Sequence, residues 1–265
     1  MGRGYEILTG RVANPGAGGA ALTPNTGNSF TVRSFADPAA AWLEQVWAKG
    51  ATAGFIQVAS PRLHDNVQGI RLPNEPAIAR AALPSYAAQL LYPQDDLVVS
   101  VAGGAAETDI GALAVYYEDI GGIDARLAQW NQVAPLIKSL LTVRVNIAAA
   151  GTLGDWSAGD RLDLTTALLK ANVDYALLGY CVTNEVGAIG VAGADTGNVR
   201  VGGPGSQEYV ETRDWFVRQS VETGLPHIPI INAANAGATL CYQVDNAAGA
   251  ANLTYFNFAE LSAAP

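Results

Sequence analysis

The sequence predicts an all-β protein with a few short helices. Its 29 glycines and 13 prolines gather in clusters such as residues 14–19 and 202–205, and short runs rich in Val, Ile, Tyr and Phe lie between the clusters. Such clusters are typical of turns, and short β-branched and aromatic runs are typical of strands. The pattern therefore favours many short strands joined by turns.

The expected strands are short stretches with apolar and aromatic side chains, several of which alternate with polar ones. We place them at residues 5–12, 29–35, 54–59, 67–72, 89–92, 97–102 and 112–118, and the pattern begins again at residues 140–148.

A first helix is expected at residues 37–49. Asp37 is a favoured N-cap, Pro38 fits the first helical position, and Gly50 ends the helix. Between these limits four apolar side chains follow helical spacing. They are Trp42, Leu43, Val46 and Trp47.

A second helix is expected at about residues 123–139. It carries Leu127, Trp130 and Val133, and Pro135 would end or kink it early. We expect Trp130, like Trp42 and Trp47 of the first helix, to anchor the core.

The second half of the chain repeats the first in order and partly in residues. Six matches pair residues 31–33 with 142–144, the helix start Asp37 with Asp163, 54–55 with 179–180, 65–72 with 195–201, 97–101 with 228–232, and 111–116 with 237–242. Five of the six are separated by 125 to 131 positions, and one inserted loop at residues 151–159 would account for the sixth. The alternative is one large β domain whose strands happen to share similar sequences.

Each repeat is about as long as one eight-stranded jelly roll, in which two Greek keys form a sandwich. The sequence therefore predicts two tandem eight-stranded jelly rolls, with short helices in loops and between the repeats. The expected domains are residues 1–125 and 140–265, joined by a connecting helix at residues 126–139. Gly54 and Phe55 should then superpose on Gly179 and Tyr180, and Arg71 on Arg200.

Composition excludes several classes of protein. Charged residues make up 15% of the chain, against about 25% in a typical soluble domain, and 49% of residues are hydrophobic. This balance excludes a disordered chain, and the net charge of −9 argues against a dedicated nucleic-acid binder. The few charges suggest that much of the surface meets other protein. We see no signal peptide after Met1 and no run long enough to span a membrane.

Neither the histidines nor the carboxylates form a pattern with obvious chemistry. His64 and His227, one in each half, do not correspond, so a cupin-type metal centre with several imidazoles is not expected. We interpret His64 as a surface loop residue and His227 as a strand-edge residue. Adjacent carboxylates on a strand point to opposite faces, so two doublets are interpreted as solvated turn charges. These doublets are Asp95-Asp96 and Glu118-Asp119.

The remaining candidates are also interpreted structurally. The glycines at residues 16–20 and 202–205 do not open a helix after a strand, so they are turn residues rather than phosphate-binding loops. Cys181 and Cys241 lie in apolar runs and should be buried, reduced thiols. We therefore expect no catalytic, cofactor-binding or metal-binding residue, no cofactor and no enzymatic activity. Trp156 and Trp215 lie near loops and could anchor a partner.

A repeated jelly roll, a helix-bearing loop in each repeat, an acidic charge and no catalytic set resemble the double jelly-roll major capsid proteins. These form the shells of tailless icosahedral DNA viruses related in architecture to adenoviruses. The resemblance covers essentially the whole chain and rests on architecture, without a short diagnostic motif. It implies a homotrimer whose six jelly rolls make a pseudo-hexagonal capsomer, located in the virion and assembled in the host cytoplasm. It also implies partners: neighbouring capsomers, vertex proteins and, in many members, an internal membrane, with no sequence-specific contact to nucleic acid.

Two other functions remain open at this stage. A sugar-binding pair of β-sandwiches, of the lectin or adhesin type, would stack sugar rings on exposed Tyr116, Tyr117 and Tyr242. An enzyme on the same scaffold would use Asp95, Asp96, Glu118 or Asp119. For the capsid function, the expected contact surfaces are the outer sides of the helices at Asp37 and Asp163 and the loops at residues 73–84 and 202–207. A charge at Ala79 or Gly203 should then block assembly.

Overall fold

The computed structural model describes residues 2–63, 69–81, 83, 88–162, 169–245 and 251–265. It is predominantly β, with 48% strand and 10% helix in several antiparallel sheets, which confirms the all-β prediction. None of the described helices is long and apolar enough to cross a membrane.

The first half of the chain, as defined here, comprises nine strands. They are β1 (Arg3–Ala13), β2 (Ala20–Ala21), β3 (Thr23–Pro24), β4 (Ala40–Lys49), β5 (Gly54–Ala59), β6 (Ile70–Asn74), β7 (Gln89–Leu91), β8 (Val98–Ala102) and β9 (Thr108–Glu118).

The second half contains nine further strands and all the helices found in the described residues. The strands are β10 (Leu127–Ala128), β11 (Ile137–Ile147), β12 (Asp160–Arg161), β13 (Asp174–Val182), β14 (Val186–Ala192), β15 (Val201–Gly205), β16 (Ile228–Asn232), β17 (Leu240–Val244) and β18 (Asn252–Leu261). The helices are α1 (Trp130–Val133), the 3₁₀ turn η2 (Ala134–Leu136), α2 (Tyr209–Thr212), α3 (Trp215–Thr223) and α4 (Ala233–Ala236).

The two halves share one pattern of strand pairing. The first half forms the sheets β3-β1-β9-β4-β7 and β2-β8-β5-β6, and the second half forms β10-β16-β13-β18-β11 and β12-β17-β14-β15. Without β3 and β10, each half has eight strands. The first pairs with the eighth, the second with the seventh, the third with the sixth and the fourth with the fifth. This is the pairing of one long antiparallel ribbon folded over on itself into two sheets.

The predicted helix at residues 37–49 is wrong, because residues 40–49 form strand β4. Asp37 and Pro38 are joined by a cis peptide bond ahead of the strand. β4 pairs with β9 along its length and with β7 at its start, and it is buried from Leu43 onward. A strand covered on both faces is apolar on both faces, so it loses the alternation that marks a half-buried strand. A bulge between Leu43 and Gln45 also interrupts the alternation of side chains between the two faces of the strand. The apolar residues on either side of the bulge therefore have a spacing that resembles that of a helix.

Other element predictions need correction as well. The helix expected at residues 123–139 is reduced to α1 and η2, with Pro135 early in η2, and strand β11 already begins at Ile137. Residues 29–35 form only an isolated bridge between Thr31 and Asp96. The strand expected at residues 67–72 is described only from residue 69, where β6 runs from Ile70 to Asn74, and the helix start expected at Asp163 lies outside the described residues, as do residues 164–168.

The repeat was predicted in order but mostly not in register. Gly54 opens the fourth strand of the first half, whereas Gly179 lies within the third strand of the second half. Two further matches are displaced in the same way. Residues 97–101, in the seventh strand of the first half, are matched to the sixth strand of the second half, and residues 111–116, in the eighth, are matched to the seventh. Arg71 lies in the fifth strand of the first half, and Arg200 directly precedes the fifth strand of the second half, so this match keeps the strand order. Connections of different length in the two halves explain the drift.

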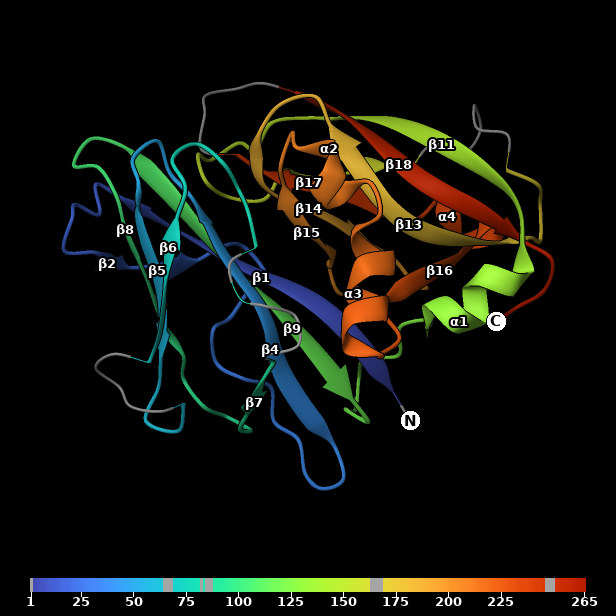
Figure 1. The fold of residues 1–265 in the computed structure, drawn as a ribbon, viewed down its shortest axis with the longest axis horizontal. Coiled ribbons are helices and arrows are strands. Elements are labelled where there is room, and N and C mark those ends of the chain that lie inside the picture. The colour runs from blue at the N-terminus through green and yellow to red at the C-terminus, as the bar shows by residue number, and fades with distance from the viewer. Residues whose placement is uncertain (1, 64–68, 82, 84–87, 163–168, 246–250) are drawn as a thin grey trace.

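The two halves lie side by side and share one continuous cluster of buried apolar residues (Figure 1). We call the contact between them the seam. At the seam Trp47 Nε1 donates to the carbonyl of Gly187 at 2.7 Å, and the N–H of Ile7 donates to the carbonyl of Arg200 at 2.8 Å. Trp47 is thus a core residue as predicted, while Trp42 and Trp130 are partly buried against the core.

Candidate functional site

The first sheet of the first half is buried on both of its faces. Seven consecutive residues of β1 are buried, and so is every residue of β9 between its two ends. The inner face packs on the other sheet of the same half: a Cβ at Gly111 would meet Leu22, Val101 and Ile56. The outer face and the free edge of β1 meet the second half instead, through β14 and the residue before β15.

The corresponding sheet of the second half is uncovered on its outer side along β11, whereas Thr212 and Arg213 lie against β13 at Gly179, and the carbonyl of Arg213 accepts from Asn257 Nδ2 at 3.0 Å. β11 has the same place in the strand order as β1, yet six of its eleven residues are exposed. Its exposed side chains include Leu140, Thr142, Arg144 and Asn146, and β18 adds half-buried Leu253, Tyr255 and Asn257 beside them. We call this surface the β11–β18 face. Leu140 is 70% exposed.

The first half shows the reciprocal difference. In the second half, β14 and β15 are buried almost throughout, because their outer side lies against the first half. Of the corresponding strands, β5 has three buried residues among six, and β6 has no fully buried residue. Their outer side, with that of β8, presents Phe55, Gln57, Arg71, Val98 and Ser100, and Val98 is 51% exposed. We call this surface the β5–β8 face.

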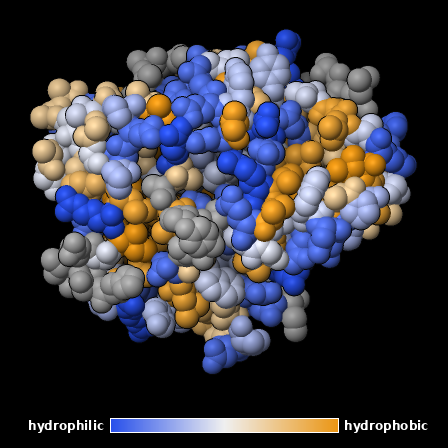
Figure 2. Space-filling model, viewed as in Figure 1, coloured by the Kyte–Doolittle hydropathy of each residue, from blue (hydrophilic) through white to orange (hydrophobic). Residues whose placement is uncertain are grey.

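The contact between the halves is therefore heterologous: it joins different surfaces of two similarly connected units. It uses the outer side of the β1–β9 sheet from the first half and the outer side of β14 and β15 from the second half. The equivalent surfaces, which are the β11–β18 face of the second half and the β5–β8 face of the first half, take no part in it. The β11–β18 face and the β5–β8 face lie on opposite sides of the molecule, away from the seam (Figure 1). Figure 2 shows apolar residues among hydrophilic ones over both halves of one side of the molecule.

A buried pair of titratable side chains crosses the seam. His227 Nε2 lies 2.6 Å from Glu44 Oε2, and neither side chain is exposed to solvent. The rings of Tyr5 and Tyr116 each lie 5.1 Å from the imidazole ring. His227 directly precedes β16, at the edge of a strand as expected, but it is sealed between the halves. The two predicted sugar-stacking residues Tyr116 and Tyr117 are buried as well.

The loop at residues 148–159 clamps the second half onto the first. Arg11 forms an ion pair with Asp155 at 2.7 Å, and Asn25 Nδ2 donates to the carbonyl of Gly154 at 2.8 Å. Burial would raise the pKa of Asp155, but hydrogen bonds from Arg11 and from backbone N–H groups outweigh it and lower that pKa. Trp156 donates to Asn28 Oδ1 at 2.9 Å, so it holds the seam and is not free for a partner.

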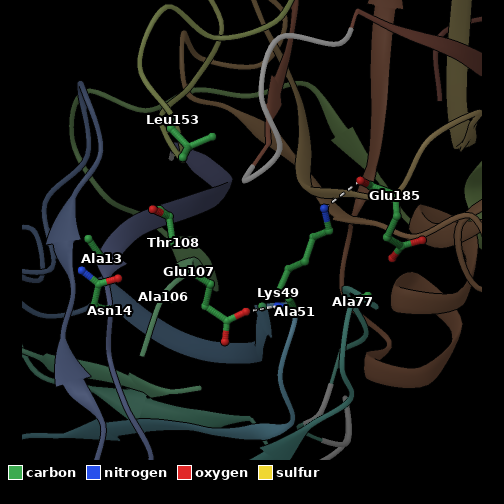
Figure 3. A pocket seen from close by; sticks show the side chains of 11 residues that line it. Ala13, Asn14, Lys49, Ala51, Ala77, Ala106, Glu107, Thr108, Leu153 and Glu185 are labelled. Atoms are coloured by element: carbon green, nitrogen blue, oxygen red, sulfur yellow. Dashed lines mark hydrogen bonds between the residues drawn. The ribbon is translucent and has the colours of Figure 1, made fainter. Parts of the chain in front are cut away.

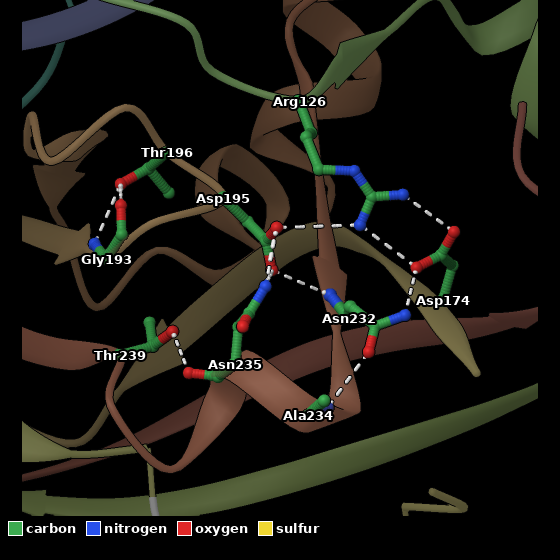
Figure 4. A network of polar contacts seen from close by, with 9 residues as sticks. All are labelled: Arg126, Asp174, Gly193, Asp195, Thr196, Asn232, Ala234, Asn235 and Thr239. Carbon is green, nitrogen blue, oxygen red and sulfur yellow. Dashed lines mark hydrogen bonds and ion pairs between the residues drawn. The ribbon is translucent and has the colours of Figure 1, made fainter. Parts of the chain in front are cut away.

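A second polar network holds the segment that connects the halves (Figure 4). Arg126 donates to both oxygens of Asp174, at 3.0 and 2.7 Å, and lies 3.5 Å from Asp195. The hydrogen bond from Arg126 lowers the pKa of Asp174. Asp195 also accepts from the N–H of Asn232 at 2.9 Å and from the side chain of Asn235. Every carboxylate in this network has partners, which indicates a structural role.

A pocket lies at one end of the seam (Figure 3). Its volume is about 650 Å³, and residues of both halves line it, among them Lys49, Glu107, Leu153 and Glu185. Lys49 Nζ donates to the carbonyl of Glu185 at 2.8 Å and lies 3.5 Å from Asp245. Burial lowers the pKa of Lys49, although Asp245 and Glu185 oppose that shift.

The predicted carboxylate doublets do not converge on a site. Asp95 is buried and accepts from Ser60 Oγ at 2.6 Å, which contradicts a solvated turn charge, while Asp96 accepts from Thr31 at the surface. Glu118 lies 3.7 Å from Arg3. No group of three or more His, Cys, Asp or Glu side chains within the described residues could hold a metal ion. Cys181 and Cys241 are free thiols as predicted, although Cys181 is only half buried.

Two parts of the predicted contact surfaces, Ala79 and residues 202–205, lie inside the molecule and need correction. Ala79 is fully buried, and its N–H donates to Glu185 Oε1 at 2.7 Å. Residues 202–205 are the buried strand β15 rather than a turn, and Trp215 donates to the carbonyl of Gly202 at 2.9 Å. Glycine is needed there because a Cβ at Gly203 would lie 2.6 Å from the Trp215 ring. A charge at Ala79 or Gly203 would therefore disrupt folding rather than assembly alone.

Comparison of the chain with family models, with curated proteins and with solved structures finds no match.

Proposed function

We propose that this protein is a double jelly-roll shell protein that assembles head to tail into trimers of pseudo-hexagonal shape. In this proposal residues 1–125 and 140–265 are the two jelly rolls, joined by the segment at residues 126–139. The pairing of the first strand with the eighth, the second with the seventh, the third with the sixth and the fourth with the fifth supports a jelly roll in each half.

The reciprocal burial of equivalent strands carries the assembly proposal. β1 and β9 are covered while β11 is exposed, and β14 and β15 are covered while β6 is accessible. A β5–β8 face that docks on the β11–β18 face of the next chain would repeat the contact already made at the seam. Heterologous contacts of this kind close into a ring when the rotation per step divides a full turn. Six halves from three chains would form such a ring.

The chemistry of the two free faces suits chains that fold before they assemble. The seam buries Tyr5, Trp47, Ile110 and Tyr116, which is a permanent apolar contact. The free faces mix apolar residues such as Leu140 and Val98 with polar ones such as Thr142 and Arg71. Such a mixture is typical of surfaces that must remain soluble on the separate partner.

In this proposal the protein is the major capsid protein of an icosahedral virus and is located in the virion, after assembly in the host cytoplasm. Its partners would be further copies of itself, vertex proteins and an internal membrane, without sequence-specific contact to nucleic acid. It would act by assembly, not by catalysis. The sugar-binding alternative is not carried further, since Tyr116 and Tyr117 are buried and Tyr242 lies beside Arg200.

Two single variants test the head-to-tail contact. Leu140→Asp places a charge on the β11–β18 face, and Val98→Asp places one on the β5–β8 face. The native chain should have three times the 27.5 kDa of one chain, or form larger shells, in light scattering and negative-stain microscopy. Each variant should be a folded monomer, because a buried unpaired carboxylate is costly in the contact. The matched control is Leu153→Asp, also at an exposed leucine but in the seam loop, and it should assemble like the native chain.

A mixture of the two variants sharpens the test. Leu140→Asp retains an intact β5–β8 face, and Val98→Asp retains an intact β11–β18 face. An equimolar mixture should therefore form one-to-one dimers and nothing larger. A native chain that stays monomeric at high concentration would contradict the proposal. A symmetric dimer that survives both substitutions would also contradict it.

A further inference from the structure

Asp109 is a buried carboxyl group that no hydrogen bond satisfies. It is the second residue of β9, its side chain is fully buried, and neither carboxyl oxygen has a hydrogen-bond partner. The group packs directly on two backbone segments. A Cβ at Gly50 would lie 2.5 Å from both carboxyl oxygens, and a Cβ at Gly103 would collide with one of them. Glycine at these two positions is what allows the carboxyl group to fit.

The charged neighbours of Asp109 do not neutralise it. Glu107, two residues earlier, accepts from the N–H of Ala51 at 2.6 Å and from the N–H of Gly104. It thus holds the same two loops, residues 50–53 and 103–107, and adds a second negative charge beside Asp109. Two strand cations pair with Ile110 in register, one on each neighbouring strand: Lys49 is engaged with Glu185 and Asp245, and Arg11 with Asp155.

We propose that Asp109 is a proton-operated switch that closes the loops at residues 50–53 and 103–107 when it is neutral and loosens them when it is charged. Both loops line the seam pocket opposite Leu153 and Glu185 of the second half (Figure 3). Their loosening would therefore open one end of the seam. This inference concerns the single chain and does not depend on the proposed assembly.

The electrostatics set the pH range of the switch. Burial, and then repulsion by Glu107, raise the pKa of Asp109 from 3.8 to about 7. The unfolded chain releases this proton near its ordinary pKa, so the folded state binds more protons between about pH 4 and pH 7. The stability that protonated Asp109 contributes is thus full below about pH 4. It falls as the pH rises from about 4 to about 7, and it falls no further above that range.

The test compares the native chain with Asp109→Asn, a neutral side chain of the same shape. The two proteins should have equal Tm values near pH 4. Near pH 8, the Tm of Asp109→Asn should be at least about 4 °C higher than that of the native chain. Even part of the rise in the pKa of Asp109 corresponds to a Tm difference of that size. Asp124→Asn, at an exposed aspartate, is the matched control and should show no such pH-dependent gain.

Hydrogen exchange gives a local readout of the same switch. After correction for intrinsic rates, the amides of Ala51 and Gly104 should exchange faster at pH 8 than at pH 5.5, and Asp109→Asn should remove that difference. Two results would overturn the proposal. One is an Asp109→Asn variant that is less stable than the native chain at pH 8. The other is a Ca²⁺ or Mg²⁺ addition that raises the native Tm at pH 8 but not that of Asp109→Asn, which would make Asp109 a cation ligand instead.

Discussion

At the scale of single residues, the seam depends on polar groups in apolar surroundings. Glu44 and His227 come from different halves and meet at 2.6 Å with no access to solvent. The second oxygen of Glu44 has no hydrogen-bond partner among the described groups. A buried charge with one partner is stable only while that partner remains.

His227→Phe should therefore destabilise the chain by about 3–5 kcal/mol, because it leaves the Glu44 carboxyl group alone in the seam. The double variant Glu44→Leu with His227→Phe should recover a large part of that loss, since no charge then remains. Urea unfolding of the single and double variants measures both values. Equal stability of the His227→Phe variant and the native chain would show that the pair contributes nothing.

At the scale of elements, β15 is a strand built largely of glycine. A Cβ at Gly202 would collide with the carbonyl of Ile189 in the neighbouring strand, whereas a Cβ at Gly18 would meet nothing within 4 Å. Gly202→Ala should thus destabilise the protein by more than about 2 kcal/mol, in the range of overpacked sites. Gly18→Ala should be neutral or slightly stabilising, because it only restricts the unfolded chain. Thermal unfolding of the two variants checks this, and similar Tm values for both would contradict the close approach of β14 and β15.

The same elements show where sequence reasoning succeeds. Strands with clear turns beside them, such as β5 and β8, were predicted within a residue or two. The all-β class and the repetition of order also followed from local patterns. These features depend on neighbouring residues, so a single sequence contains them.

The errors share one physical cause. β4 was predicted as a helix because it is apolar on both faces, and β15 as a turn because of its glycines, which its close packing requires; burial by the other half cannot be seen in local sequence. The same holds for Trp156, interpreted as a residue that could anchor a partner, and for His227, interpreted as a strand-edge residue, since both are buried in the seam. The faces proposed for assembly were missed as well. Their signal is a difference in burial between equivalent strands, and that signal exists only after the two halves are packed.

At the scale of the whole molecule, the seam makes the two halves one folding unit. The outer face of the first sheet would expose Tyr5, Trp47, Ile110 and Tyr116 without the second half. An exposed apolar surface of that kind costs about 25 cal/mol for each Å² returned to water. The clamp of Arg11 on Asp155 and the pair of His227 with Glu44 would be lost at the same time.

We therefore expect the chain to unfold in one cooperative transition, although its two halves have the same strand order. Scanning calorimetry on the Leu140→Asp variant, which the proposed assembly predicts to be a monomer, measures this without a contribution from assembly, and the calorimetric and van't Hoff enthalpies should agree. Trp47→Ala removes a hydrogen bond and a large side chain from the seam, so it should lower the single Tm by the equivalent of about 3–5 kcal/mol. Two separate transitions in the Leu140→Asp protein would show that the halves fold independently. In that case the seam would be a docking contact, weak enough to exchange with the equivalent contact between chains.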